Sequence, residues 1–293
     1  MTMFDYIIAC IRLRSTIDVA AVVRGFRPFE VEYAPEVEAD CTFTIVEQLP
    51  IERYAIVKHL SEFEVTEAEA DCTFARTTTG YLFSIKRRIS NDEPTLFHID
   101  GDTLQITSNI RCDNGIDISL LRFGLWVMFG VVLSSKHAIA IHSSVIECGG
   151  RCALFLGESG TGKSTHTRLW RENIEGTSLL NDDSPIVRVV DGQAMVFGSP
   201  WSGKTPCYKN LSYPIAGFCR LSQAPHNAIT RLKTIAAIGA LLPSCPPAFA
   251  HDEYLQDCIC ATLGELLQRV PAYHLECLPD RAAAELSHST IMG

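Results

Sequence analysis

The chain has 293 residues, of which 47% are hydrophobic and 20% are charged, a composition typical of a folded globular protein with one large or two small cores. Its formal net charge of −9 argues against a nucleic-acid partner, because such binding needs clustered lysine and arginine, and no such cluster occurs. The twelve cysteines are scattered without a CxxC pair, which favours reduced, mostly buried thiols over a disulfide framework.

Neither the N-terminus nor the longest apolar stretch has the pattern of a membrane or export signal. The N-terminus has an acid at Asp5 and an apolar run too short for a secretory signal, so we expect a cytoplasmic protein. The longest apolar stretch, Phe123 to Leu133, contains two glycines and is far shorter than the ~20 residues that cross a bilayer. We therefore expect it to be a buried core helix and expect no membrane partner.

Residues 1–116 are predicted to form a β-rich N-terminal region, because short stretches rich in Val, Ile, Thr, Phe and Tyr alternate with turn residues. Two segments, 29–45 and 63–76, both carry the run EADCTF, and the simplest interpretation is two similar strands that pair with each other. The repeated Asp-Cys pairs lack histidine partners at ligand spacing, which favours ordinary strand positions over a metal site.

Residues 117–293 are predicted to form a second domain that mixes strands and helices. Apolar residues from Ile118 to Val132 recur at three- and four-residue steps, as in a helix. The pattern then predicts a strand over 138–146, a Gly-Gly turn, a strand over 151–156, a strand ending in the acids of LLNDD (179–183), a hairpin of 186–190 with 194–197, and a loop over 198–205. Helices are predicted over 229–242 and 254–270 and from 279 to 286, followed by frayed final residues.

The most informative stretch is CALFLGESGTGKSTHTRLW at 152–170, where an apolar strand, a glycine-rich turn and a helix start follow one another. The pattern GxxxxGKS predicts a phosphate-binding loop, in which backbone N–H groups and the helix N-terminus hold polyphosphate oxygens. Lys163 is expected to reach the β- and γ-phosphates, and Ser164 to supply a hydroxyl to Mg²⁺. The residues predicted to bind the nucleotide are Gly157, Glu158, Ser159, Gly160, Thr161, Gly162, Lys163, Ser164 and Thr165.

Two adjacent acids, Asp182 and Asp183, end the apolar strand that follows the predicted loop and helix. Strand ends are where sites assemble in α/β proteins, and a nucleotide enzyme needs an acid there to hold magnesium or to accept a proton. Side chains alternate along a strand, so we assign the base to Asp183 and the metal to Asp182.

The run from Ile141 to Asp183, with IHSSVIE, GESGTGKST and LLNDD, resembles the catalytic domain of HPr kinase/phosphorylase, whose fold is shared with phosphoenolpyruvate carboxykinase. The resemblance implies an α/β (α+β) P-loop domain of that type with a β-rich N-terminal half and a helical C-terminal segment. It also implies that His142, Lys163 and Asp183 are catalytic and that Ser164 binds magnesium. From the residues alone, His142 is one histidine on an apolar strand, where a core role is more common.

Three features depart from the family pattern. Thr165 follows the loop serine where the family has a glutamate, and no glutamate lies between Glu175 and Glu253 to act as the second metal ligand, a place that Asp182 could fill. The family's arginine-bearing loop is also unmatched. Lys204, in GSPWSGKT, could supply its positive charge, and Arg231 is a weaker candidate.

Three functions remain open. The first is a kinase that transfers the γ-phosphate of ATP, with Mg²⁺, to a hydroxyl, such as a serine, of a protein, peptide or small molecule. The second is a carboxykinase-like enzyme, and the third is a nucleotide-binding switch with slow ATPase activity. We favour the kinase, because a switch needs no base and no basic cluster suits a dicarboxylate. The phosphoacceptor and the choice between ATP and GTP are not defined by the sequence. If the resemblance extends to assembly, it implies a homo-oligomer.

Overall fold

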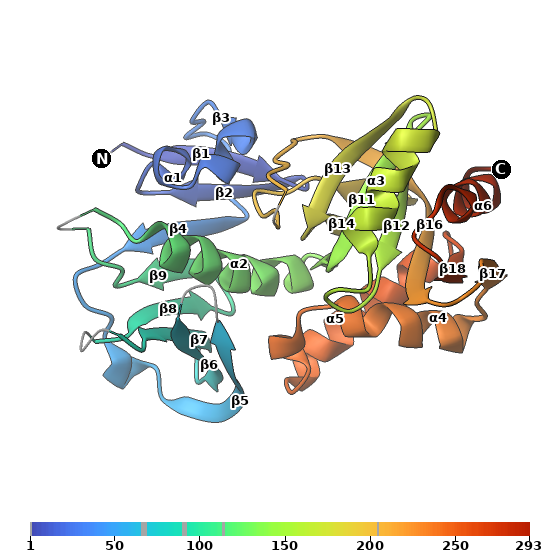
Figure 1. Cartoon of the computed structure of the whole chain (residues 1–293). Helices are drawn as coiled ribbons and strands as arrows, with labels where there is room; N and C mark the ends of the chain where they lie inside the picture. Colours follow the sequence, from blue (N-terminus) through green and yellow to red (C-terminus); the bar gives the residue numbers. More distant parts are fainter. Residues whose placement is uncertain (1, 66–68, 90–92, 113–114, 204) are drawn as a thin grey trace. The chain divides into compact units, whose positions relative to one another are not determined.

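The computed structural model describes residues 2–65, 69–89, 93–112, 115–203 and 205–293. It is a mixed α/β structure with large sheets and several helices, in agreement with the predicted α/β class (Figure 1). Contacts divide it into two compact units. Unit 1 contains Met1–Ser135 and Ala248–Gln256, and unit 2 contains Lys136–Pro247 and Asp257–Gly293. The sequence pattern predicts a domain boundary after residue 116. In the structure, the helix at Ile118–Ser135 still belongs to unit 1, so the boundary falls after Ser135.

Unit 1 is rich in strands, as its alternating sequence predicted, and these strands form a mixed sheet. Its described strands follow the order β3-β1-β2-β4-β9-β8-β7-β6-β5. Short helical turns occur at α1 (Val19–Val22), Arg24–Phe29, Ile51–Arg53 and Pro247–Phe249. The strands are β1 (Phe4–Ile8), β2 (Ile11–Ser15), β3 (Glu30–Val31), β4 (Cys41–Ile45), β5 (Ile56–Val65), β6 (Ala70–Thr77), β7 (Gly80–Arg87), β8 (Thr95–Asp100) and β9 (Gln105–Ser108).

The two EADCTF segments lie in this one sheet, but the prediction that they pair with each other was wrong. The first becomes β4, which pairs in parallel with β2 and β9, and the second becomes β6, which pairs antiparallel with β5 and β7. The similar sequences reflect similar burial, since Cys41, Phe43, Cys72 and Phe74 are all buried. Strand partners are chosen by chain topology, which the repeat does not encode.

Helix α2 (Ile118–Ser135) packs against β7 and β8 of this sheet. It is long and apolar enough to cross a membrane by length and composition, but 67% of it is buried, as the sequence predicted for a core helix. Gly124 lets the helix approach the sheet closely, because a Cβ atom at this position would overlap the buried ring of Phe97.

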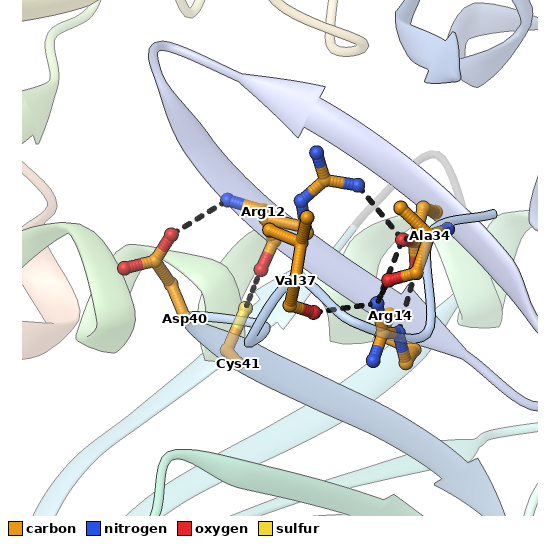
Figure 2. A network of polar contacts seen from close by, with 7 residues as sticks. Arg12, Arg14, Ala34, Val37, Asp40 and Cys41 are labelled. Carbon is orange, nitrogen blue, oxygen red and sulfur yellow. Dashed lines mark hydrogen bonds and ion pairs between the residues drawn. The ribbon is translucent and has the colours of Figure 1, made fainter. Parts of the chain in front are cut away.

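A buried carboxylate secures the edge of the sheet in unit 1. The fully buried Asp5 accepts hydrogen bonds from Arg12 and Arg14, at 2.8 Å each. Burial would raise the pKa of Asp5, but the hydrogen bonds from Arg14 and Arg12 hold it below its ordinary value. Arg14 also donates to the carbonyl oxygens of Ala34 and Val37, at 2.7 and 2.9 Å (Figure 2).

The Asp40–Cys41 pair of the first EADCTF segment belongs to the same network. The Asp40 carboxylate accepts from the backbone N–H of Arg12 at 2.9 Å, and the Cys41 thiol lies 3.9 Å from the Arg12 carbonyl oxygen (Figure 2). These contacts attach the segment before β4 to the β1–β2 hairpin. Among the described residues, no group of three or more His, Cys, Asp or Glu could hold a metal ion. The contacts of Asp40 and Cys41 with Arg12 give the pair a structural role.

Unit 2 contains a second mixed sheet, whose described strands follow the order β10-β14-β15-β16-β12-β11-β13, with β18 and then β17 branching from β16. The predicted strand over 138–146 is divided at Ile141 and His142, where the chain leaves β14 and joins β13. The strands are β10 (Ala138–Ala140), β11 (Ser143–Cys148), β12 (Arg151–Leu156), β13 (Thr177–Asp183), β14 (Ile186–Val190), β15 (Gln193–Phe197), β16 (Ser212–Gln223), β17 (Ala228–Arg231) and β18 (Ala272–Cys277).

The helices of unit 2 are α3 (Lys163–Asn173), α4 (Thr234–Leu241), a short turn at Leu242–Ser244, most of α5 (Glu253–Leu267) and α6 (Arg281–Met292). The helix predicted over 229–242 is wrong in its first part, because Ala228–Arg231 pairs with β18 instead. The final residues do not fray as predicted. Asp280 accepts from the backbone N–H of Ala283 at 2.9 Å, and Ile291 is buried in the core with Trp170 of α3.

Candidate active site

The strands of unit 2 bring four positions into one row across the sheet. Ser143, at the start of β11, is paired with Leu156, at the end of β12, on one side and with Asp183, at the end of β13, on the other. Leu156 is in turn paired with Arg220 of the parallel strand β16. Because β12, β13 and β16 run in the same direction, their last residues and the loops that follow them lie at one edge of the sheet.

The loop over residues 157–162, called the glycine loop below, connects β12 to α3 at this edge. Gly157, Gly160 and Gly162 have φ angles of 153°, 82° and 108°, which favour glycine. The turn is closed within the loop, since the Thr161 N–H and hydroxyl both donate to the Glu158 carbonyl oxygen, at 3.2 and 2.7 Å. The loop then leads directly into the first turn of α3, as the sequence motif predicted.

Lys163 is buried at the start of α3. Its ammonium group donates to the carbonyl oxygens of Gly157 and Glu158, at 2.8 and 3.1 Å. Burial lowers the pKa of Lys163, and the positive charge of Arg220 lowers it further, whereas the negative charges of Asp183 and Asp182 oppose this shift. The ammonium group therefore lies within electrostatic range of both acids and of a second cation.

The two adjacent acids have different partners. The Ser164 hydroxyl donates to Asp182 Oδ1 at 3.0 Å, and His142 Nδ1 lies 3.2 Å from Asp183 Oδ1. Asp182 is buried, while His142 and Asp183 are partly open to solvent, with 45% and 33% of their side chains exposed. The structure thus brings together four of the residues that the sequence singled out, in two pairs.

The segment that follows β15 lies against these acids. The Gly203 N–H donates to the Asp182 carbonyl oxygen at 2.9 Å, and Ser202 forms an isolated bridge with Asp183. Asn181 fixes the segment further by donating to the Trp201 carbonyl oxygen at 3.0 Å. Lys204, which the sequence singled out as a source of positive charge, lies outside the described residues. Arg231, the weaker candidate, is an exposed residue at the end of β17.

Arg220 is a site residue that the sequence reasoning missed. It reaches the glycine loop from β16: its guanidinium lies 3.7 Å from the Glu158 carboxylate and donates to the Ala240 carbonyl oxygen at 3.1 Å. The available signal was an arginine inside an otherwise apolar run, IAGFCRL, which is unusual in a buried strand. The strand itself had not been predicted, so its charged residue could not be placed.

The donor set at this edge suits a nucleotide with a bound magnesium ion. Glycines with positive φ precede a helix N-terminus, which is an arrangement that presents N–H groups to phosphate oxygens. In the contacts described, the Lys163 ammonium group donates only to carbonyl oxygens of the loop. It can therefore exchange these acceptors for the oxygens of a phosphate group. The Ser164 hydroxyl and the Asp182 carboxylate converge, and both are oxygen ligands of the kind that Mg²⁺ prefers.

No family model matches the chain, and no curated protein matches it. Among solved structures, it is similar to the HPr(Ser) kinase/phosphatase from Coxiella burnetii, with 11% sequence identity over 52% of this chain and 87% of that chain. The TM-score is 0.31. Similarity of this extent carries no weight for function, so the functional proposal depends on the site itself.

Proposed function

We propose that this protein is a cytoplasmic, ATP-dependent kinase that transfers the γ-phosphate to a hydroxyl, such as a serine, of a protein, peptide or small molecule. The observation that carries the proposal is the pair of His142 and Asp183, 3.2 Å apart and partly exposed. Asp183 is in the same row of the sheet as Leu156, at the end of β12, from which the glycine loop starts. A carboxylate beside a phosphate site is the base that hydroxyl phosphorylation requires.

In this proposal the glycine loop holds the phosphates through backbone N–H groups and Lys163. Asp183 accepts the proton of the acceptor hydroxyl, and the oxygen of that hydroxyl bonds to the γ-phosphorus. The bond between the γ-phosphorus and the β–γ bridging oxygen breaks at the same time, so ADP leaves. His142 Nδ1, 3.2 Å from Asp183 Oδ1, positions the Asp183 carboxylate for this step. Lys163 and Arg220 place positive charge near the transferring group, where negative charge develops. Magnesium, held by Ser164 and Asp182, would neutralise phosphate charge.

The experiment is incubation of the protein with γ-labelled ATP and magnesium in a cell lysate, followed by identification of the labelled acceptor. We expect a phosphorylated hydroxyl, and we expect Lys163→Ala and Arg220→Ala to reduce the labelling. Removal of a single charge that stabilises the transition state typically costs ~10²–10³-fold in turnover. Calorimetry with Mg-ATP shows whether Lys163→Ala also weakens binding, as a phosphate-binding lysine should.

Each alternative function gives a different result. If oxaloacetate and ATP yield phosphoenolpyruvate faster than any hydroxyl is phosphorylated, the enzyme is a carboxykinase. Release of labelled phosphate without any labelled acceptor would identify a nucleotide-binding switch with slow ATPase activity. Unchanged ATP affinity and turnover in Lys163→Ala would refute the assignment of the glycine loop to phosphate.

A further inference from the structure

A pocket of about 560 Å³ lies beside the glycine loop, within unit 2. This volume is within the ~300–1,000 Å³ range of small-molecule sites. Gly160 to Gly162 form its border with the loop, and His166 and Leu169 line it from α3. The opposite side consists of the residues that follow β16 and β18, among them Pro225 and Leu278. Neither Asp182 nor Asp183 lines the pocket, so it is distinct from the acidic end of the site.

The wall formed by the two strand ends is held by hydrogen bonds. The Ala224 N–H donates to the Cys277 carbonyl oxygen at 3.2 Å. Asn227 accepts from the Leu278 N–H at 2.8 Å and donates to the Asp280 carboxylate at 3.0 Å. Because Asp280 also caps α6, the wall is anchored to a helix of the core. The pocket is therefore formed before any ligand binds, which lowers the entropic cost of binding.

The chemistry of the pocket suits a neutral, flat ligand. Its described lining contains no Asp, Glu, Lys or Arg, and most of its surface comes from apolar groups. Burial lowers the pKa of His166 to about 4, so this ring adds no charge at neutral pH. Leu278 is 38% exposed, and Pro225 and Pro279 are exposed as well, so apolar surface faces the open pocket. A nucleobase has flat faces that stack on such surfaces.

We propose that this pocket holds the purine ring of the nucleotide whose phosphates bind the glycine loop, and that it accepts adenine and guanine without strong preference. The proposal rests on the proposed function, because it assumes that the loop binds a nucleotide. Thr165, on the first turn of α3, lines the pocket and connects it to the predicted phosphate site. One ligand can therefore occupy both.

The lack of preference follows from the polar groups available. Guanine differs from adenine by donors such as its 2-amino group, which a carboxylate reads best. No carboxylate lines the described pocket, and the nearby Asp280 is already engaged by Asn227 and by the Ala283 N–H. Gln223 borders the pocket, and its side-chain amide can turn to accept or donate, although it donates to the Gly160 carbonyl oxygen at 3.4 Å. Such a site separates purines by shape alone, which discriminates weakly.

The test is calorimetry with Mg-ATP, Mg-GTP and inorganic tripolyphosphate, which has the phosphates but no base. For the wild type we expect ATP and GTP affinities within about tenfold of each other. Leu278→Ser and Pro225→Ser, which remove apolar surface from two exposed positions on the wall without adding charge, should weaken both nucleotides by about tenfold or more and leave tripolyphosphate unchanged. Leu211→Ser, a substitution of an exposed leucine outside the lining, is the matched control and should change none of the three.

The outcomes separate this proposal from the proposed function. If the wild type binds nucleotides and tripolyphosphate but both wall variants retain full ATP affinity, the pocket assignment is overturned while the phosphate site stands. An equal loss for tripolyphosphate would show a general structural effect and would also overturn it. If the affinities for ATP and GTP differed by more than about 100-fold, the proposed lack of preference between adenine and guanine would be refuted. If the wild type bound neither ATP nor tripolyphosphate, both proposals would be refuted.

Discussion

Asp182 and Asp183 are neighbours in sequence, yet one is buried beside a hydroxyl and the other is partly exposed beside an imidazole. Alternation of side chains along β13 causes this separation, because successive residues of a strand point to opposite faces. The two carboxylates can therefore perform different tasks in one reaction, with Asp182 on the side of Ser164 and Asp183 on the side of His142.

We predict that Asp183→Asn lowers turnover by about 10²–10⁴-fold, the typical contribution of a general base, and changes nucleotide affinity little. Asp182→Asn should instead raise the magnesium concentration needed for half-maximal activity, because in the proposed mechanism the Asp182 carboxylate is an oxygen ligand of magnesium. Turnover and magnesium dependence measured for both variants test the assignment. Near-full phosphotransfer by Asp183→Asn, or a loss confined to metal affinity, would contradict it.

Where a local motif fixed their positions, the sequence predicted correctly which candidate residues lie close together. The glycine loop, Lys163 and Ser164 follow β12 within a few residues, so strand, turn and helix start had to be adjacent. Arg220 reaches the same edge only because β16 pairs with β12, which is a contact between distant segments. A single sequence gives no signal for that pairing, and the charged residue alone did not identify its neighbours.

The same limit applies to the elements of the fold. The predicted hairpins β11–β12 and β14–β15 are confirmed, because turns such as Gly149-Gly150 and Asp191-Gly192 join strands that are adjacent in sequence. The elements that were wrong or missed all depend on distant partners: the pairing of the EADCTF segments, and strands β16 to β18. A short apolar run such as 228–231 fits a helix or a strand, and its pairing with β18 decides between them.

Helix α2 offers a prediction for packing in unit 1. Gly124→Ala should destabilise the protein by about 1–3 kcal/mol, since the added methyl group would overlap the fully buried Phe97 ring and force it or the helix to move. Unfolding by urea, monitored in the unit that contains each substitution, gives the measurement. Gly239→Ala in α4 is the matched control.

The control position is an exposed helical glycine, and an added Cβ there has no neighbour within 4 Å. We expect Gly239→Ala to be neutral or slightly stabilising, because alanine costs less conformational entropy than glycine in a helix. If Gly124→Ala were equally harmless, the close approach of α2 to β8 would not constrain this position.

At the scale of the whole molecule, each unit contains a buried histidine that is neutral at physiological pH. His98, on β8, stacks on Tyr54 at 3.7 Å between ring centroids, and His166, on α3, lies 2.9 Å from the Ser287 hydroxyl. Burial lowers the pKa of each to about 4, from an ordinary value of 6.5. For His98, the negative charge of Asp100 opposes the shift. Both rings must remain neutral for the folded state to keep its packing.

The sign of the resulting pH dependence is fixed by these shifts. Between pH 6.5 and 4 the unfolded chain binds protons at both histidines while the folded protein does not, so stability falls as the pH is lowered through this range. From pH 7 to pH 5 the expected loss is roughly 2 kcal/mol for each histidine. Urea unfolding at pH 7, 6 and 5, with hydrogen exchange as the readout for each unit, should show the decrease in both units.

Substitution separates these histidines from other titrating groups. His98→Gln and His166→Gln should each lower stability at pH 7, because a buried ring and its contacts are lost, and should each reduce the slope between pH 7 and pH 5 in their own unit. His226→Gln, at an exposed position, should leave the slope as in the wild type, because folding changes the surroundings of an exposed side chain little. A slope in unit 2 that persists unchanged in His166→Gln would show that the acid sensitivity of this unit does not originate at His166.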